Sequence, residues 1–274
     1  MWDSLVRSIY TVGHRLLVGS IERMLFPGAE IGTPLPPIEE ALRRRRHPII
    51  LLHGYGDQPY GSQDMARSLR RDGWTVYVFE TPQMGLAGID AAIGSLHELV
   101  SRVRRETGAA KVDLVGHSQG GVIARAFVKF GPDAASVGRV VSLASPHNGL
   151  KAWFNGPIDA MLGSRLLNPL VSRGLDELLM GRSFWDRLNA GDPTPGDVRY
   201  TSIFAATFDG MVIPESATLE GATNVVLRRD RGGRGPHHFM VNHQSLEAYV
   251  QLRLALLDLP PLPGTTVPDG SPLA

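Results

Sequence analysis

The chain has 274 residues, 43% of them hydrophobic, and its 28 Lys and Arg residues nearly balance its 27 Asp and Glu residues. This balance gives no electrostatic reason to expect a nucleic-acid partner. The sequence contains no cysteine, which excludes disulfides, thiolate nucleophiles and cysteine-based metal sites. The length fits one α/β domain with a sizeable core, with or without a small insertion.

The first part of the chain, residues 1–46, is predicted to form an amphipathic helix over residues 2–19 followed by a Pro-rich lead-in. The apolar face of this helix consists of Trp2, Leu5, Ile9, Val12 and Leu16. Such a helix packs on its own domain or at a subunit contact, or else lies on a membrane surface. No secretory signature and no apolar run of membrane-spanning length is found, so a cytoplasmic or peripherally membrane-associated protein is expected. The oligomeric state is not readable from the sequence.

From residue 47 onward, apolar runs typical of buried strands alternate with helical patterns. Strands are predicted at residues 49–52, 74–79, 112–115, 137–143, 200–206 and 224–227, and helices at 62–71, 86–105, 122–130 and 244–258. This alternation predicts an α/β fold with a doubly wound, mostly parallel sheet over residues 47–259. Residues 260–274 are Pro-rich and are expected to form a loose tail.

The alternation fails at about residues 150–198, where helical fragments such as 161–170 and 175–182 suggest a cap inserted after a strand. This segment carries four large apolar side chains that look exposed, namely Trp153, Phe154, Phe184 and Trp185. One hypothesis is that they line a substrate pocket; the alternative is that they fill a small core within the cap.

The motif Gly116-His117-Ser118-Gln119-Gly120 lies between a predicted strand and a predicted helix. A turn this sharp strains its central residue, and side chains two positions away on either side would collide with the strand and the helix, which explains glycine at both. Ser118 is therefore expected to project from the end of the sheet as a candidate nucleophile.

A serine hydroxyl needs a base within hydrogen-bond reach and a carboxylate that fixes the tautomer of that base. Asp209 ends the strand after the cap, at the sheet edge where sites of such folds form, and is the candidate acid. Three histidines follow it. His243 directly precedes the last helix and is the favoured base, while His237 and His238, in a Gly-rich loop, are kept as alternatives.

The loop His53-Gly54-Tyr55-Gly56-Asp57 follows a buried strand, so its backbone N–H groups could face a developing negative charge. No histidine pair has the spacing of metal ligands on a helix. Neither a metal nor another cofactor is expected.

Five segments together resemble the actinobacterial lipases and esterases of the α/β-hydrolase superfamily: residues 53–56, 116–121, 145–149, 209–214 and 241–246. The resemblance covers roughly residues 47–257. It implies a serine ester hydrolase that acts on lipid-like or acyl esters through an acyl-enzyme. It also implies Ser118 as nucleophile, Asp209 as acid, His243 as base, and the N–H groups of Tyr55 and Gln119 as the oxyanion hole. An acyltransferase with the same three residues, or a non-catalytic binding protein on this fold, remains an alternative.

Overall fold

The structure, a computed structural model, describes residues 47–57, 62–150, 172–179, 183–227, 236–238, 241 and 245–267. The predicted helix at residues 2–19 and the rest of the lead-in lie outside the described residues, as do Trp153, Phe154 and His243. Within the described ranges, no helix is both long enough and apolar enough to cross a membrane.

In the described part of the chain, seven strands form one sheet in the order β2-β1-β3-β4-β5-β6-β7. The strands are β1 Ile49–Leu52, β2 Val76–Phe79, β3 Val112–His117, β4 Val137–Leu143, β5 Arg199–Ala205, β6 Thr223–Leu227 and β7 Thr266–Val267. All neighbouring strands run parallel except β6 and β7, which are antiparallel. The prediction of a mostly parallel sheet is therefore confirmed.

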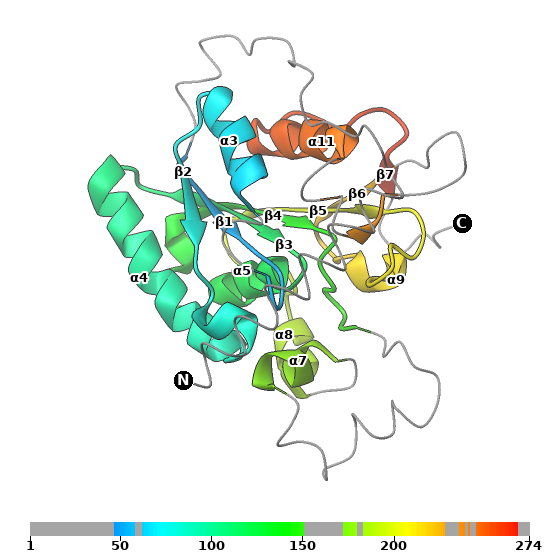
Figure 1. The fold of residues 1–274 in the computed structure, drawn as a ribbon, viewed down its shortest axis with the longest axis horizontal. Helices are drawn as coiled ribbons and strands as arrows, with labels where there is room; N and C mark the ends of the chain where they lie inside the picture. The colour runs from blue at the N-terminus through cyan, green and yellow to red at the C-terminus, as the bar shows by residue number, and fades with distance from the viewer. Residues whose placement is uncertain are drawn as a thin grey trace. The chain divides into compact units, whose positions relative to one another are not determined.

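Helices cover both faces of this sheet (Figure 1), which confirms that it is doubly wound. The longer helices are α3 Gln63–Arg71, α4 Ile89–Thr107, α5 Gln119–Phe130 and α11 Leu246–Leu256, and the shorter ones are α7 Arg173–Leu178, α8 Ser183–Asn189 and α9 Pro214–Ala217. Two 3-10 turns, η2 Pro82–Gly85 and η3 Ala134–Ser136, connect them to the strands. Helix α4 begins three residues later than predicted because Gly88, at φ 95°, precedes it in a non-helical conformation.

The core is divided by the sheet, because successive side chains of a strand point to opposite faces. In β1, Ile50 and Leu52 pack in the cluster that contains α4, α5 and α8, whereas Ile49 and Leu51 pack against α3 and α11. All four residues of β1 are buried. This explains why the central strands read as continuous apolar runs rather than as alternating patterns.

The C-terminal segment differs from the predicted loose tail. Residues Thr266 and Val267 pair with β6, and the buried Thr265 accepts a hydrogen bond from Gln251 Nε2 over 3.0 Å. Residues 266 and 267 therefore belong to the folded sheet.

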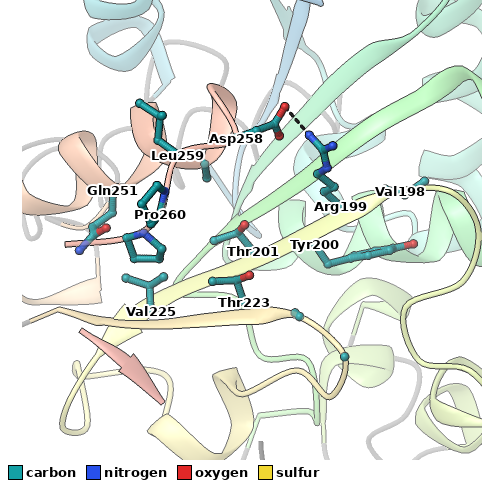
Figure 2. A pocket seen from close by; sticks show the side chains of 14 residues that line it. Val198, Arg199, Tyr200, Thr201, Thr223, Val225, Gln251, Asp258, Leu259 and Pro260 are labelled. Atoms are coloured by element: carbon teal, nitrogen blue, oxygen red, sulfur yellow. Dashed lines mark ion pairs between the residues drawn. The ribbon is translucent and has the colours of Figure 1, made fainter. Parts of the chain in front are cut away.

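A cavity of about 630 Å³ lies near the amino ends of β5 and β6, beside the end of α11. Figure 2 shows Thr201 and Thr223 from neighbouring strands on its wall, with Arg199 paired to Asp258 at one side. Because Ser118 follows the carboxyl end of β3, this cavity is distinct from the predicted active site.

A charge network crosses the same amino end of the sheet. Arg139 Nη1 donates to Asp113 Oδ2 over 2.9 Å, and Arg139 Nε donates to Asp258 Oδ1 over 2.9 Å. His47 Nδ1 lies 2.8 Å from the other oxygen of Asp113. Asp113 and Arg139 are both buried; Arg139 compensates Asp113 for lost hydration, while Asp113 and Asp258 together compensate Arg139.

Candidate active site

Ser118 forms the turn between β3 and α5, with φ 53° and ψ −123°. A serine at positive φ is strained, and such strain persists only where the surroundings enforce it. The backbone N–H of Ser118 donates to the carbonyl of Leu143 over 2.9 Å, which ties the turn to β4. Ser118 thus sits at the N-terminus of α5, at the carboxyl edge of the sheet.

Glycines make this turn possible. A Cβ on Gly116 would lie 2.3 Å from the carbonyl carbon of Gly120, and one on Gly120 would lie 2.3 Å from the carbonyl oxygen of Leu52. A Cβ on Gly121 would lie 2.1 Å from Ser145 Oγ. The expected collisions on both sides of the serine are therefore present, and the third glycine of the motif is equally constrained.

Asp209 lies in the loop after β5 with its carboxylate held from two sides. Its Oδ1 accepts hydrogen bonds from the backbone N–H groups of Met211, over 2.8 Å, and Val212, over 2.7 Å. Its Oδ2 lies 2.9 Å from His238 Nδ1. Asp209 is only 5% exposed, so the carboxylate is fixed in one orientation within a buried site.

His238 is the imidazole that the structure brings to Asp209. The His238 backbone N–H also donates to the Asp209 carbonyl over 2.8 Å, and the residue is 1% exposed. His117 Nε2 donates to the His238 carbonyl over 3.0 Å, with the two ring centroids 4.8 Å apart. Because His117 directly precedes Ser118, His238 lies beside the serine turn.

The other two candidate bases stand differently. His243 lies outside the described residues, so its role stays a prediction. His237 lies against Gly210, where an added Cβ would be 2.6 Å from its Nε2. Burial lowers the pKa of His237, although the nearby Asp209 carboxylate opposes that shift. Sequence reasoning kept His238 only as an alternative; the signal for it was the pair of histidines between the last parallel strand and the last helix.

The predicted oxyanion loop passes beside the serine, since a Cβ on Gly54 would lie 3.2 Å from Ser118 Cβ. His53 fixes this loop: its Nδ1 donates to the Gly54 carbonyl over 2.9 Å, and its Nε2 accepts from the Thr81 N–H over 3.2 Å. Burial lowers the pKa of His53, which favours the neutral ring that this pattern requires. Gln119 is the first residue of α5, so its N–H has no partner within the helix.

Two of the four aromatic residues predicted to be exposed are in fact buried. Phe184 and Trp185, both in α8, are 4% and 5% exposed and pack edge to face with ring centroids 5.1 Å apart. They belong to the same cluster as the buried side chains of α4 and α5, and Trp185 Nε1 donates to the Leu179 carbonyl over 3.0 Å. These two side chains therefore pack in the main core of the domain rather than in a separate small core of the cap.

These residues assemble at one edge of the sheet a serine in a strained turn, a carboxylate paired with an imidazole, and a loop that carries backbone donors. An imidazole whose Nδ1–H is held by a carboxylate carries its lone pair on Nε2, the nitrogen that can accept a proton. The arrangement is suited to activating a hydroxyl group as a nucleophile.

Comparison with known proteins shows which protein family this chain belongs to. A family model described as palmitoyl protein thioesterase matches residues 48–186, just over half of the chain. A triacylglycerol lipase of Vibrio cholerae serotype O1 is 28% identical over 204 residues, covering 68% of this chain and 62% of that protein. A triacylglycerol lipase of Pseudomonas fragi is 33% identical over 110 residues, covering 38% of this chain and 36% of that protein. The chain thus matches less than two thirds of the length of these relatives.

Solved structures show the same fold at low sequence identity. Aspergillus fumigatus lipase B superposes with a TM-score of 0.64 at 20% identity, covering 84% of this chain and 62% of that one. The mature Bacillus licheniformis lipase BlEst2 gives a TM-score of 0.56 at 19% identity, covering 84% of this chain and 97% of that one. With the strand order and the serine turn described above, these matches identify the fold as that of the α/β-hydrolases, and the chain belongs to the palmitoyl protein thioesterase family.

Proposed function

We propose that the protein is a serine hydrolase of carboxylic acyl esters, with Ser118 as nucleophile, His238 as base and Asp209 as the acid that orients the base. The observation that carries this proposal is the buried 2.9 Å contact between Asp209 Oδ2 and His238 Nδ1, beside the turn that presents Ser118. The lipase names of the relatives and the family description support a lipid-like acyl group as the substrate class.

In the first half of the reaction, His238 Nε2 accepts the proton of Ser118 Oγ while that oxygen attacks the carbonyl carbon of the ester. The carbonyl oxygen becomes an oxyanion, which the N–H groups of Tyr55 and Gln119 stabilise. When the tetrahedral intermediate collapses, the proton passes from His238 to the departing alcohol and the acyl group stays on Ser118.

In the second half, His238 accepts a proton from water, whose oxygen attacks the acyl-enzyme. Collapse of the second tetrahedral intermediate releases the carboxylic acid and returns the proton to Ser118 Oγ. Asp209 stabilises the imidazolium that forms in each half and holds His238 Nδ1, so that the proton is exchanged at Nε2. The orientation of Asp209 is itself fixed by the two backbone N–H groups that donate to its Oδ1.

The proposal is tested by active-site titration with a fluorophosphonate, together with initial rates on p-nitrophenyl esters from acetate to palmitate. We expect one probe molecule bound per chain in the wild type and none in Ser118→Ala. Hydrolysis of the ester series by a protein that is not labelled, or labelling that persists in Ser118→Ala, would refute Ser118 as the nucleophile.

The same assay separates the related substrate classes. Rates on an oxygen ester and on a thioester with the same acyl chain show whether the protein prefers the substrate of a lipase or that of a thioesterase. An added alcohol acceptor shows whether the acyl group is transferred to water or to the alcohol. The predicted acyl pocket is tested by Trp153→Ala: a pocket residue changes the relative rates along the ester series, whereas a residue that packs in a core leaves them unchanged in the folded variant.

A further inference from the structure

Helix α7 is tied directly to the loop that carries the first proposed oxyanion donor. The hydroxyl of Tyr55 shares a hydrogen bond with Ser172 Oγ, with 2.7 Å between the oxygens. Ser172 is the N-cap of α7, where its Oγ also accepts from the N–H of Leu175 over 3.3 Å. The Tyr55 side chain therefore reaches away from its loop and fastens it to the first turn of α7.

The second proposed donor, Gln119, is connected to the same helix through η2. The Gln119 side chain is fully buried, and its Nε2 donates to the Gly85 carbonyl over 3.1 Å. Gly85 in turn touches α7: a Cβ on Gly174 would lie 1.8 Å from the Gly85 oxygen and 3.1 Å from Gln119 Nε2. The Gly174 N–H donates to the Leu86 carbonyl over 3.1 Å, so only a residue without a side chain fits here.

The η2 segment is strained and is braced from both sides. Gln83 and Met84 have φ values of 49° and 58°, in the left-handed region that non-glycine residues rarely adopt. The Met84 carbonyl accepts from the Gly56 N–H over 2.8 Å, next to Tyr55. On the other side of the strained segment, Glu177 of α7 accepts from the Ile89 N–H over 2.6 Å. Hydrogen bonds and close packing thus connect the Tyr55 loop, η2 and α7 to one another next to the serine turn.

From these contacts we infer that α7 positions the oxyanion hole, and that Tyr55 and Ser172 act as a pair of positioning residues through their shared hydrogen bond. The inference rests on the proposed function. Backbone donors stabilise an oxyanion only when they lie about 3 Å from the place where the charge develops. Small displacements are therefore costly to the rate, and a contact that fixes the Tyr55 peptide acts on the chemical step without touching the substrate.

The test compares Tyr55→Phe, Ser172→Ala and the double variant, with Tyr77→Phe as the matched control, because the Tyr77 hydroxyl bonds Glu106 at an exposed position. We expect kcat for a p-nitrophenyl ester to fall by roughly three- to tenfold in each single variant, with KM changed less than about twofold. The double variant should lose no more than Ser172→Ala alone, because the hydrogen bond that Tyr55→Phe removes is already absent in Ser172→Ala. Tyr77→Phe should retain the wild-type kcat.

A second measurement is independent of turnover. Amide hydrogen exchange in a peptide covering residues 53–57 should become faster in both single variants, because the tie that restrains this loop is gone. Unchanged exchange there overturns the inference, as does a folded Ser172→Ala with wild-type kcat or a double variant whose loss is the product of the two single losses. Failure of the proposed function looks different: the wild type is then not labelled by fluorophosphonate, whatever the exchange of the loop.

Discussion

Asp209 and His238 form a carboxylate–imidazole pair with 2.9 Å between Oδ2 and Nδ1, and their backbones are joined by a second hydrogen bond from the His238 N–H to the Asp209 carbonyl. The double connection holds the ring relative to the carboxylate even though the two residues are 29 positions apart. Whether His238 is the base can therefore be tested directly by substitution.

We expect His238→Ala to lower ester turnover by roughly 10⁴ to 10⁶, the loss expected also for Ser118→Ala, because neither residue functions without the other. The matched variant is His243→Ala. The sequence favours His243 as the base, but we expect this variant to retain most of the wild-type activity. The measurement is kcat/KM on a soluble p-nitrophenyl ester, with folding checked by thermal unfolding. Near wild-type activity in His238→Ala together with loss in His243→Ala would restore the assignment made from the sequence.

Asp209→Asn should reduce kcat by about 10⁴ at neutral pH while leaving the fold intact. The remaining amide oxygen can still accept from Met211 and Val212, which turns the amide nitrogen toward His238 and requires Nδ1 to accept. The ring proton then sits on Nε2, where it blocks proton transfer from Ser118. A loss smaller than about tenfold would assign the acid to another carboxylate.

Two glycine substitutions should act in opposite directions. Gly120→Ala places a methyl group 2.3 Å from the backbone oxygen of Leu52, so we expect about 1–3 kcal/mol lower unfolding free energy and loss of activity. Gly94, in the exposed part of α4, has nothing within 4 Å of an added Cβ, so Gly94→Ala should stabilise the protein by up to about 1 kcal/mol. Urea unfolding of both variants measures the difference. Equal stabilities would contradict the packing described around the serine turn.

Replacing Arg139, the buried cation of the charge network, should lower the free energy of unfolding. Among the described residues, Arg139→Met leaves the buried Asp113 side chain with only His47 as a polar partner, and we expect about 3–5 kcal/mol loss of unfolding free energy. The control is Arg67→Met, which breaks the exposed pair with Asp64 on α3 and should change stability by less than about 1 kcal/mol. Chemical denaturation at neutral pH compares the two, and a similar small loss in both would mean that Asp113 finds another partner.

His147 should make the stability depend on pH. It is completely buried, and neither ring nitrogen has a hydrogen-bond partner among the described residues. Burial, with a further contribution from the Arg125 cation, holds its pKa well below the ordinary value. Since the folded-state pKa is lower than the unfolded one, the stabilisation is complete above about pH 6.5 and is lost as the pH falls below it, by up to about 1.4 kcal/mol per pH unit.

Replacing this imidazole with an apolar side chain removes that titration. His147→Leu should therefore show a shallower loss of unfolding free energy between about pH 6.5 and about pH 5 than the wild type. Urea unfolding across that range gives both slopes. Identical slopes would mean that His53 and His237, whose pKa values burial also lowers, account for the whole effect.

The layers of the fold could be predicted from the sequence because buried parallel strands leave continuous apolar runs, and the strand at 137–143 was located to the residue. Strand β3 extends two residues beyond its apolar run because Gly116 and His117 still pair with β4. Nothing in the side chains of those two residues indicates that backbone pairing.

In the site, too, the residues that follow strands could be predicted from the sequence, and those placed by tertiary contacts could not. Ser118 and Asp209 follow strands, so the sequence pattern locates them, whereas the partner of Asp209 depends on how a Gly-rich loop folds back onto the sheet. Proximity to α11 favoured His243, but the contact seen for His238 is tertiary and has no periodic signature. Phe184 and Trp185 looked exposed because a seven-residue helix gives too little pattern to show which side faces the core.

The two-residue strand β7 covers the edge of the sheet that β6 would otherwise present to other chains. By pairing with Asn224 and Val225, and through the Thr265 carbonyl that accepts from the Val226 N–H over 2.7 Å, it occupies the outer edge of β6. Without it, β6 would present unpaired N–H and C=O groups on which a strand of another chain could add. We therefore expect a chain truncated after Leu259 to aggregate more readily through the exposed edge of β6, although it would retain all the proposed catalytic residues.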